Sequence, residues 1–194
     1  MVRFNRLIMS YPERILKSFI LIFSLAAGTI NARAQQYKLD TIVYNGQPGK
    51  YINLVFLGDG FQAAELPIFL DNARNLRNYI FSISPFSEYK RIFNVFAISV
   101  ASSQSGASHP GTATDESSSN NQPVVSVNTA FNSTFDYAAI HRLLVPQNYT
   151  EIFNALSNNA PFYDEIFMLV NSPYYGGSGS PNLATSSLNS SSYE

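Results

Sequence analysis

A short apolar run that ends in two glycines constrains this chain more than any other feature. Residues 51–60 read YINLVFLGDG, and their apolar part is rich in β-branched and aromatic side chains. The run is too short for a buried helix of ordinary length, so it predicts a buried central strand. The turn Gly58-Asp59-Gly60 leads into a helical pattern, an order typical of an α/β layer. Functional sites in such layers tend to lie at the carboxyl ends of the strands.

Four further segments predict the rest of that layer. Apolar residues at helical spacing predict an amphipathic helix from Leu66 to about Ser82, and the same pattern predicts a second helix over Tyr149–Asn158. Ile92–Val100 and Asp164–Asn171 are apolar runs that predict core strands. Because no proline interrupts these strands, the β–α–β–α–β order predicts a layered α/β fold around a central sheet.

The remaining segments are less regular. Tyr37–Tyr44 predicts a first strand, which we expect to pair with the strand over Tyr51–Leu57 as a hairpin across a Gly/Pro-rich turn. Residues 174–179 predict a glycine turn, and Leu183–Leu188 predicts an edge strand. Ala101–Asn128 is dominated by Ser, Thr, Asn, Gly and Pro, and a loop of this length is typical of either a functional or a disordered segment.

The amino terminus predicts export. A basic stretch precedes the apolar run Phe19–Ala27, and Ala32-Arg33-Ala34 fits the rule for signal-peptide cleavage. The run is far shorter than the roughly 20 residues that a membrane span needs, so a cleaved signal is favoured over an anchor. We therefore expect residues 1–34 to be a signal peptide and residues 35–194 to be one domain. The mature protein would be exported, without stable membrane association.

Composition excludes several classes of partner and chemistry. The chain has 194 residues and no Cys, which excludes disulfides, thiol catalysis and Cys-ligated zinc. Five of its 12 basic residues and one of its 13 acidic residues precede residue 35. The mature chain thus has seven basic and twelve acidic residues, a net charge of −5. A mildly acidic protein has no electrostatic reason to bind nucleic acid.

Few residues could carry chemistry. Of the two histidines, His141 lies among apolar residues and is expected to be structural, whereas His109 lies in a Ser/Gly/Pro loop, which favours function. Asp59 could cap the turn that follows it, ligate a cation or support a ligand. Asp115 lies in the Ser-rich loop, where its oxygens could bind Ca²⁺ or simply be solvated. The chain has no His-Glu-x-x-His motif, so we expect no metal ligands in it.

LVFLGDG also resembles the first block of GDS-type esterases and lipases. In those enzymes a strand ends in Gly-Asp-Ser and the serine is the nucleophile. Gly60 stands where that serine would be, and no Asp-x-x-His block lies near the carboxyl end. A degenerate esterase therefore remains the third hypothesis for this chain.

A resemblance over most of the chain is to the secreted IgA-type zinc metallopeptidases, peptidase family M64. The matching pieces occur in the family's order and spacing from about residue 51 to residue 187. They are INLVFLGDGF with AAELP, PFSEYKRIFNVFAISVAS, SGASHPGT, TAFNSTFD, IHRLL, and EIFMLVNSPYYGGSGS with ATSS. The resemblance implies a zincin-like layered α/β domain with a central mixed sheet, incomplete at the carboxyl end. It also implies an exported enzyme with a zinc cofactor and a protein or peptide substrate.

The resemblance stops short of the family's zinc motif. In the family, the segment similar to YYGGSGS-NLATSS leads into a helix that carries His-Glu-x-x-His, and this chain ends at Glu194 before any such helix. We therefore expect the amino-terminal part of a metallopeptidase, inactive and without zinc as given. We expect His109, Tyr175, Gly176 and Gly177 to contact substrate, and the strand at Leu183–Leu188 to pair with its backbone. The alternative is an exported, non-catalytic protein-binding module with a degenerate peptidase fold.

Overall fold

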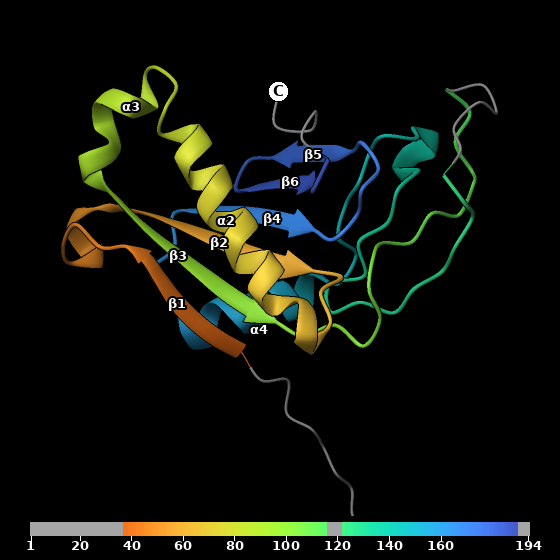
Figure 1. Ribbon diagram of the computed structural model, residues 1–194, viewed down its shortest axis with the longest axis horizontal. Helices are drawn as coiled ribbons and strands as arrows, with labels where there is room; N and C mark the ends of the chain where they lie inside the picture. Colours follow the sequence, from red (N-terminus) through yellow and green to blue (C-terminus); the bar gives the residue numbers. More distant parts are fainter. Residues whose placement is uncertain (1–36, 116–121, 190–194) are drawn as a thin grey trace, which may run out of the picture. The chain divides into compact units, whose positions relative to one another are not determined.

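The computed structural model describes residues 37–115 and 122–189, which form a layered α/β domain on one six-stranded sheet (Figure 1). Its strands are β1 (Tyr37–Val43), β2 (Ile52–Asp59), β3 (Phe93–Val100), β4 (Glu165–Val170), β5 (Gly177–Ser180) and β6 (Leu183–Ser187). Its helices are α2 (Leu66–Ile80), α3 (Phe86–Tyr89) and α4 (Tyr149–Asn159). Single 3₁₀ turns occur at Pro48–Lys50, Ala63–Glu65, Lys90–Ile92 and Tyr137–Ala139. The predicted α/β class is confirmed.

The sheet is mixed, with the order β1-β3-β2-β4-β6-β5. β2, β3, β4 and β6 are parallel, while the outer strands β1 and β5 run antiparallel to their neighbours. The predicted central strand is confirmed, because β2 has a parallel partner on each side and its residues Val55, Phe56 and Leu57 are fully buried. A strand buried on both faces explains the unbroken apolar run in the sequence.

Helices cover both faces of the sheet (Figure 1). On one face, α2 packs through Phe69, Ala73 and Leu76 against alternate residues of β2 and β3 such as Phe56 and Val95. On the other face, α4 and the irregular segments pack against the intervening strand residues. Both helices begin near the predicted positions. α2 has a proline in its first turn, and Asn148 caps α4 by accepting a hydrogen bond from the Glu151 amide at 3.3 Å.

Two predicted pairings are wrong. β1 does not form a hairpin with β2; it pairs with β3, because both edges of β2 are occupied by β3 and β4. The strand at Leu183–Ser187 is not at the edge either, since β6 lies between β4 and β5. Part of the predicted glycine turn forms β5, which becomes the last strand on that side. The apolar pattern located the strands but carried no information about their neighbours.

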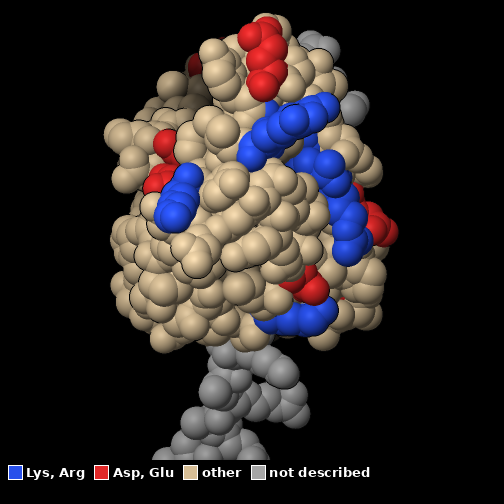
Figure 2. Space-filling model, turned by 90° about the vertical axis from the view of Figure 1, so that its left-hand side faces the viewer, with Lys and Arg blue, Asp and Glu red and all other residues tan. Residues whose placement is uncertain are grey.

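Charged residues make up only 13% of the chain. On the face shown in Figure 2, basic and acidic side chains are interspersed among many uncharged ones. None of the helices in residues 37–115 and 122–189 combines the length and the apolarity that crossing a membrane requires. The predicted signal peptide lies outside the described residues, so export stays a prediction.

Candidate functional site

The irregular segments between β3 and α4 gather beyond the carboxyl ends of the central strands (Figure 1). Short pairings order their described parts: Ser108 with Thr134, His109 with Val125, and Thr134 with Val145. The His109 amide donates to the Val125 carbonyl at 2.8 Å, and the Val125 amide donates back at 2.9 Å. The described residues between β3 and α4 therefore form an ordered loop layer. It lies at the carboxyl ends of the strands, where α/β proteins place their sites.

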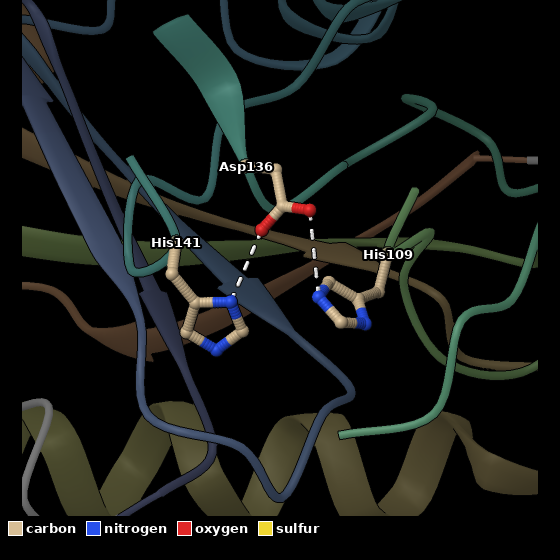
Figure 3. Close-up of side chains that lie close together, drawn as sticks. All are labelled: His109, Asp136 and His141. Atoms are coloured by element: carbon tan, nitrogen blue, oxygen red, sulfur yellow. Dashed lines mark hydrogen bonds and ion pairs between the residues drawn. The ribbon is translucent and has the colours of Figure 1, made fainter. Parts of the chain in front are cut away.

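His109, Asp136 and His141 meet within this layer (Figure 3). Nε2 of His109 lies 3.4 Å from Oδ2 of Asp136, and Nδ1 of His141 lies 3.1 Å from Oδ1 of the same carboxylate. All three residues are buried, with exposures of 5%, 5% and 9%. The two imidazole rings are nearly perpendicular, with centroids 5.0 Å apart. One carboxylate thus holds both histidines of the chain.

A tight turn brings Asp136 and His141 together. The backbone of Asp136 is left-handed (φ 61°), as is that of Ala138 (φ 54°) and Ala139 (φ 61°), an uncommon conformation for residues with a side chain. The Asp136 amide donates to the His141 carbonyl at 3.2 Å, which closes the turn. The backbone strain is stored at the residue that carries the carboxylate, a place where function often accounts for it.

Neighbouring groups fix the cluster from several sides. The Thr112 amide donates to Oδ2 of Asp136 at 2.7 Å, and Nδ1 of His109 lies 3.0 Å from the Pro123 carbonyl oxygen. Phe135 stacks on the His141 ring and meets the His109 ring edge-on. These contacts limit rotation of all three side chains.

Asp59, at the end of β2, anchors the segment that leads to Asp136. It is fully buried, and its carboxylate accepts hydrogen bonds from the amides of Phe131 (3.0 Å) and Ser133 (2.9 Å). It also accepts from the hydroxyls of Thr129 (2.9 Å) and Ser102 (3.4 Å). Asp59 therefore supports the site through the backbone and does not belong to the His/Asp/His group.

The other predicted site residues differ in how close they lie to the His/Asp/His cluster. Oδ1 of Asp115 accepts from the His141 amide at 2.9 Å, so this exposed residue supports the cluster. Gly176 lies against Phe135, and a Cβ added there would come within 2.4 Å of that ring. Tyr175 is exposed and Gly177 opens β5. The structure thus joins His109 and Asp115 to the cluster directly, and Gly176 through Phe135.

Sequence reasoning did not single out Asp136 and interpreted His141 as structural. The available signal was Asp136 and His141 five residues apart in a segment that ends at Pro146. That signal was weak because the third member, His109, lies 27 residues earlier than Asp136, and the two meet through contacts between distant segments, such as the Ser108–Thr134 pairing and the Thr112–Asp136 hydrogen bond.

A cavity of about 220 Å³ lies beside β5. Its wall includes Tyr137, Gln147, Tyr149 and the strand residues Gly179 and Ser180. Gly179 is exposed, and a Cβ added there would meet nothing within 4 Å. β5 is the last strand on this side of the sheet, and Leu183 and Thr185 of its neighbour β6 also line the cavity.

Comparison with known proteins connects this geometry to a family. The family model described as IgA Peptidase M64 matches residues 41–192, which is most of the chain. The chain belongs to the IgA peptidase M64 family. The match spans all six strands except the start of β1, and it includes the three residues of the His/Asp/His cluster. No protein of curated function matches this M64 chain significantly.

M64 is a metallopeptidase family, which is compatible with a zinc cofactor. Two imidazoles and a carboxylate are a donor set that zinc accepts. In residues 37–115 and 122–189, His109, Asp136 and His141 are the only group of at least three such side chains that could hold a metal ion. Their ligand atoms lie within 4.8 Å of one another, so the residues present fit an ion of this kind.

Proposed function

We propose that this M64 domain is the amino-terminal, substrate-binding part of an exported zinc metallopeptidase that hydrolyses peptide bonds. The observation that carries the proposal is the family match over residues 41–192. A peptidase-type domain needs a surface for an extended peptide and a zinc centre beside it. The structure offers a candidate for the first at the edge of the sheet.

We place the peptide at the outer edge of β5. An extended chain binds a sheet edge through main-chain hydrogen bonds, and its side chains enter neighbouring pockets. The edge is already occupied near Gly177, whose amide donates to the Arg142 carbonyl at 3.0 Å. Gly179 and Ser180 lie beyond that contact and line the 220 Å³ cavity. The substrate would therefore pair with these two residues, and not with the strand at Leu183–Ser187.

Catalysis requires ligands of the His-Glu-x-x-His type, and the 194 residues do not contain this motif. A zinc ion held by that motif supplies an activated water for attack on the peptide bond. His109, Asp136 and His141 cannot present such a water to a polypeptide, because their exposures are only 5–9%. The chain as given is therefore expected to bind peptide without hydrolysing it.

The decisive experiment reads the gene beyond the codon for Glu194. An in-frame His-Glu-x-x-His motif within about thirty codons, close behind β6, is the expected result. The longer protein and the 194-residue chain would then be compared on an unstructured protein substrate with zinc. Chelator-sensitive cleavage by the longer protein alone supports the proposal. A stop codon after Glu194, or no cleavage by the longer protein, overturns it.

One feature favours a second function, an exported protein-binding module without catalysis. Both histidines of the chain are engaged with Asp136, so neither is free to act on a substrate. In this case the β5 edge would bind a protein segment and release it unchanged. A stop codon after Glu194, together with saturable binding of an extended peptide, would favour this function over the peptidase.

A further inference from the structure

We propose that His109, Asp136 and His141 bind one zinc ion, which fastens the loop layer onto the sheet. The proposal differs from the expectation that the chain holds no metal ligands. It rests on the geometry of these three side chains and is independent of the proposed function.

The hydrogen bonds of His109 leave a lone pair directed at a carboxylate. The Pro123 carbonyl can only accept, so Nδ1 of His109 carries the hydrogen of their 3.0 Å contact. In the neutral ring, Nε2 then has a lone pair, and it faces Oδ2 of Asp136 at 3.4 Å. Two acceptors facing each other in a buried site are unfavourable unless a proton or a metal ion lies between them. A zinc ion would satisfy both atoms.

The spacing of the donor atoms matches a tetrahedral site. With bonds of about 2.0–2.1 Å, tetrahedral zinc holds its ligand atoms about 3.3–3.4 Å apart. The two nitrogen–oxygen separations here are 3.4 and 3.1 Å, and the three ligand atoms lie within 4.8 Å of one another. A small movement of the His141 imidazole toward Nε2 of His109 would complete the site. The fourth position can be filled by the second carboxylate oxygen or by a water.

The donor set selects the kind of ion. Calcium and magnesium prefer sites built from oxygen ligands, whereas imidazole nitrogens favour zinc and its transition-metal neighbours. Oxygen-activating iron uses two histidines and one carboxylate but needs open coordination positions. Burial of all three residues, with Phe135 packed on both rings, favours a closed zinc site instead.

The supporting contacts resemble those around known metal ligands. Ligating histidines commonly donate their other ring N–H to a carbonyl or carboxylate. His109 does so to Pro123, and the Thr112 amide donates to the carboxylate oxygen nearest His109. Zinc would therefore link the segment after β3 with the segment that Asp59 anchors to β2.

The first test uses the chain's own histidines as probes. The 194-residue chain, made without a histidine tag and freed of metal with a chelator, is titrated with zinc chloride. Nitrogen NMR then follows the only two imidazoles in the sequence. We expect both rings to shift and to saturate together at one zinc per chain, and the midpoint of thermal unfolding to rise. Failure of either ring to respond, or saturation only by calcium, overturns the proposal.

The second test uses matched variants and calorimetry. His109→Gln, Asp136→Asn and His141→Gln should each weaken zinc binding more than about 100-fold, because loss of a supporting contact alone costs 10–100-fold. Asp71→Asn, which removes an exposed carboxylate paired with Arg74 on α2, should leave affinity unchanged. Unaltered affinity in the three variants overturns the proposal. If they do not fold, the NMR titration of the unsubstituted chain decides.

Discussion

At the scale of single residues, the carboxylate of Asp59 connects the central strand with two loop segments. It accepts from Ser102 after β3 and from Thr129, Phe131 and Ser133 in the segment before Asp136. Every one of these donors except the Ser102 hydroxyl lies within 3.0 Å. A buried carboxylate with several partners contributes more to stability than any one bond suggests, because its removal leaves all the donors without an acceptor at once.

Replacing Asp59 should therefore destabilise the fold strongly. Asp59→Ala leaves buried N–H and O–H groups without acceptors, and we expect the free energy of unfolding to fall by about 3 kcal/mol. Urea denaturation followed by circular dichroism measures this. The exposed Asp71→Asn should change it by less than about 0.5 kcal/mol. Equal effects of the two substitutions would show that the Asp59 network contributes little.

Gly60 is required by its conformation and by its surroundings. Its φ is +73°, and an added Cβ would come within 2.0 Å of the Gly106 carbonyl oxygen. Gly60→Ala should lower the unfolding free energy by at least about 2 kcal/mol. Gly49→Ala, where a Cβ meets nothing within 4 Å, should leave it unchanged or raise it by up to about 1 kcal/mol. Comparable losses in both variants would contradict this explanation.

The same crowding bears on the esterase comparison. A serine at position 60 would have to place its side chain where the Gly106 backbone lies. The turn therefore has no room for a nucleophile, and the glycine of Gly-Asp-Gly serves backbone packing. Sequence reasoning could identify this turn because its constraints are local, but it could not find Asp136, whose role depends on a histidine in another segment.

At the scale of elements, the side chain of Tyr37 connects β1 with α4. Its hydroxyl donates to the Glu151 carboxylate. Burial, and then the bond to Glu151 and its charge, raise the pKa of Tyr37 above its ordinary value. The unfolded chain ionises this group near pH 10, whereas the folded chain keeps it protonated. Its contribution to stability is therefore complete below about pH 10 and is lost as the pH rises above that.

Tyr37→Phe should make stability less sensitive to alkaline pH. We expect the variant to lose about 1 kcal/mol near neutrality, because one hydrogen bond is gone. Its unfolding free energy should then decline less steeply than that of the unchanged chain above pH 9. Urea titrations at several pH values measure both effects. Tyr44→Phe, at a residue that is 58% exposed, is the control. If the unfolding free energies of Tyr37→Phe and the unchanged chain decline in parallel above pH 9, the prediction is refuted.

Periodicity predicted the elements well because each one satisfies a local pattern. The apolar residues of α2 recur at helical spacing, and β2 and β4 are unbroken apolar runs. Pairing is different, since it depends on which edges remain free once the sheet has formed. β1 and β6 were given the wrong neighbours for this reason, whereas the Gly177–Ser180 strand was predicted as a turn because it is too rich in glycine and serine to show a strand pattern.

At the scale of the whole domain, an apolar groove lies between the end of α2 and β6. It encloses about 300 Å³ and is lined by Leu76, Tyr79, Ile80, Ile83, Phe86, Phe167 and residues 184–186. Ile83 and Phe86 are 43% and 46% exposed. Contiguous apolar surface of this kind promotes association between molecules.

We expect the 194-residue chain to associate as its concentration rises. Ile83→Lys places a charge at the groove and should reduce both light scattering and binding of a hydrophobic dye. Ile68→Lys adds the same charge at an isoleucine that is 50% exposed but does not line the groove, and it should have a smaller effect. A chain that stays monomeric in analytical ultracentrifugation at all concentrations would contradict this prediction.

The strand order also has a kinetic consequence. β2 pairs with β3 through residues 41 apart in sequence, such as Asn53 and Asn94, and with β4 through residues 111 apart, such as Leu54 and Glu165. A ribosome adding about 5–20 residues per second needs roughly 6–20 s to make the longer stretch. Until then, the buried strand β2 lacks one of its two neighbours. Parallel pairing over such distances is slow, so this domain should fold slowly for its size.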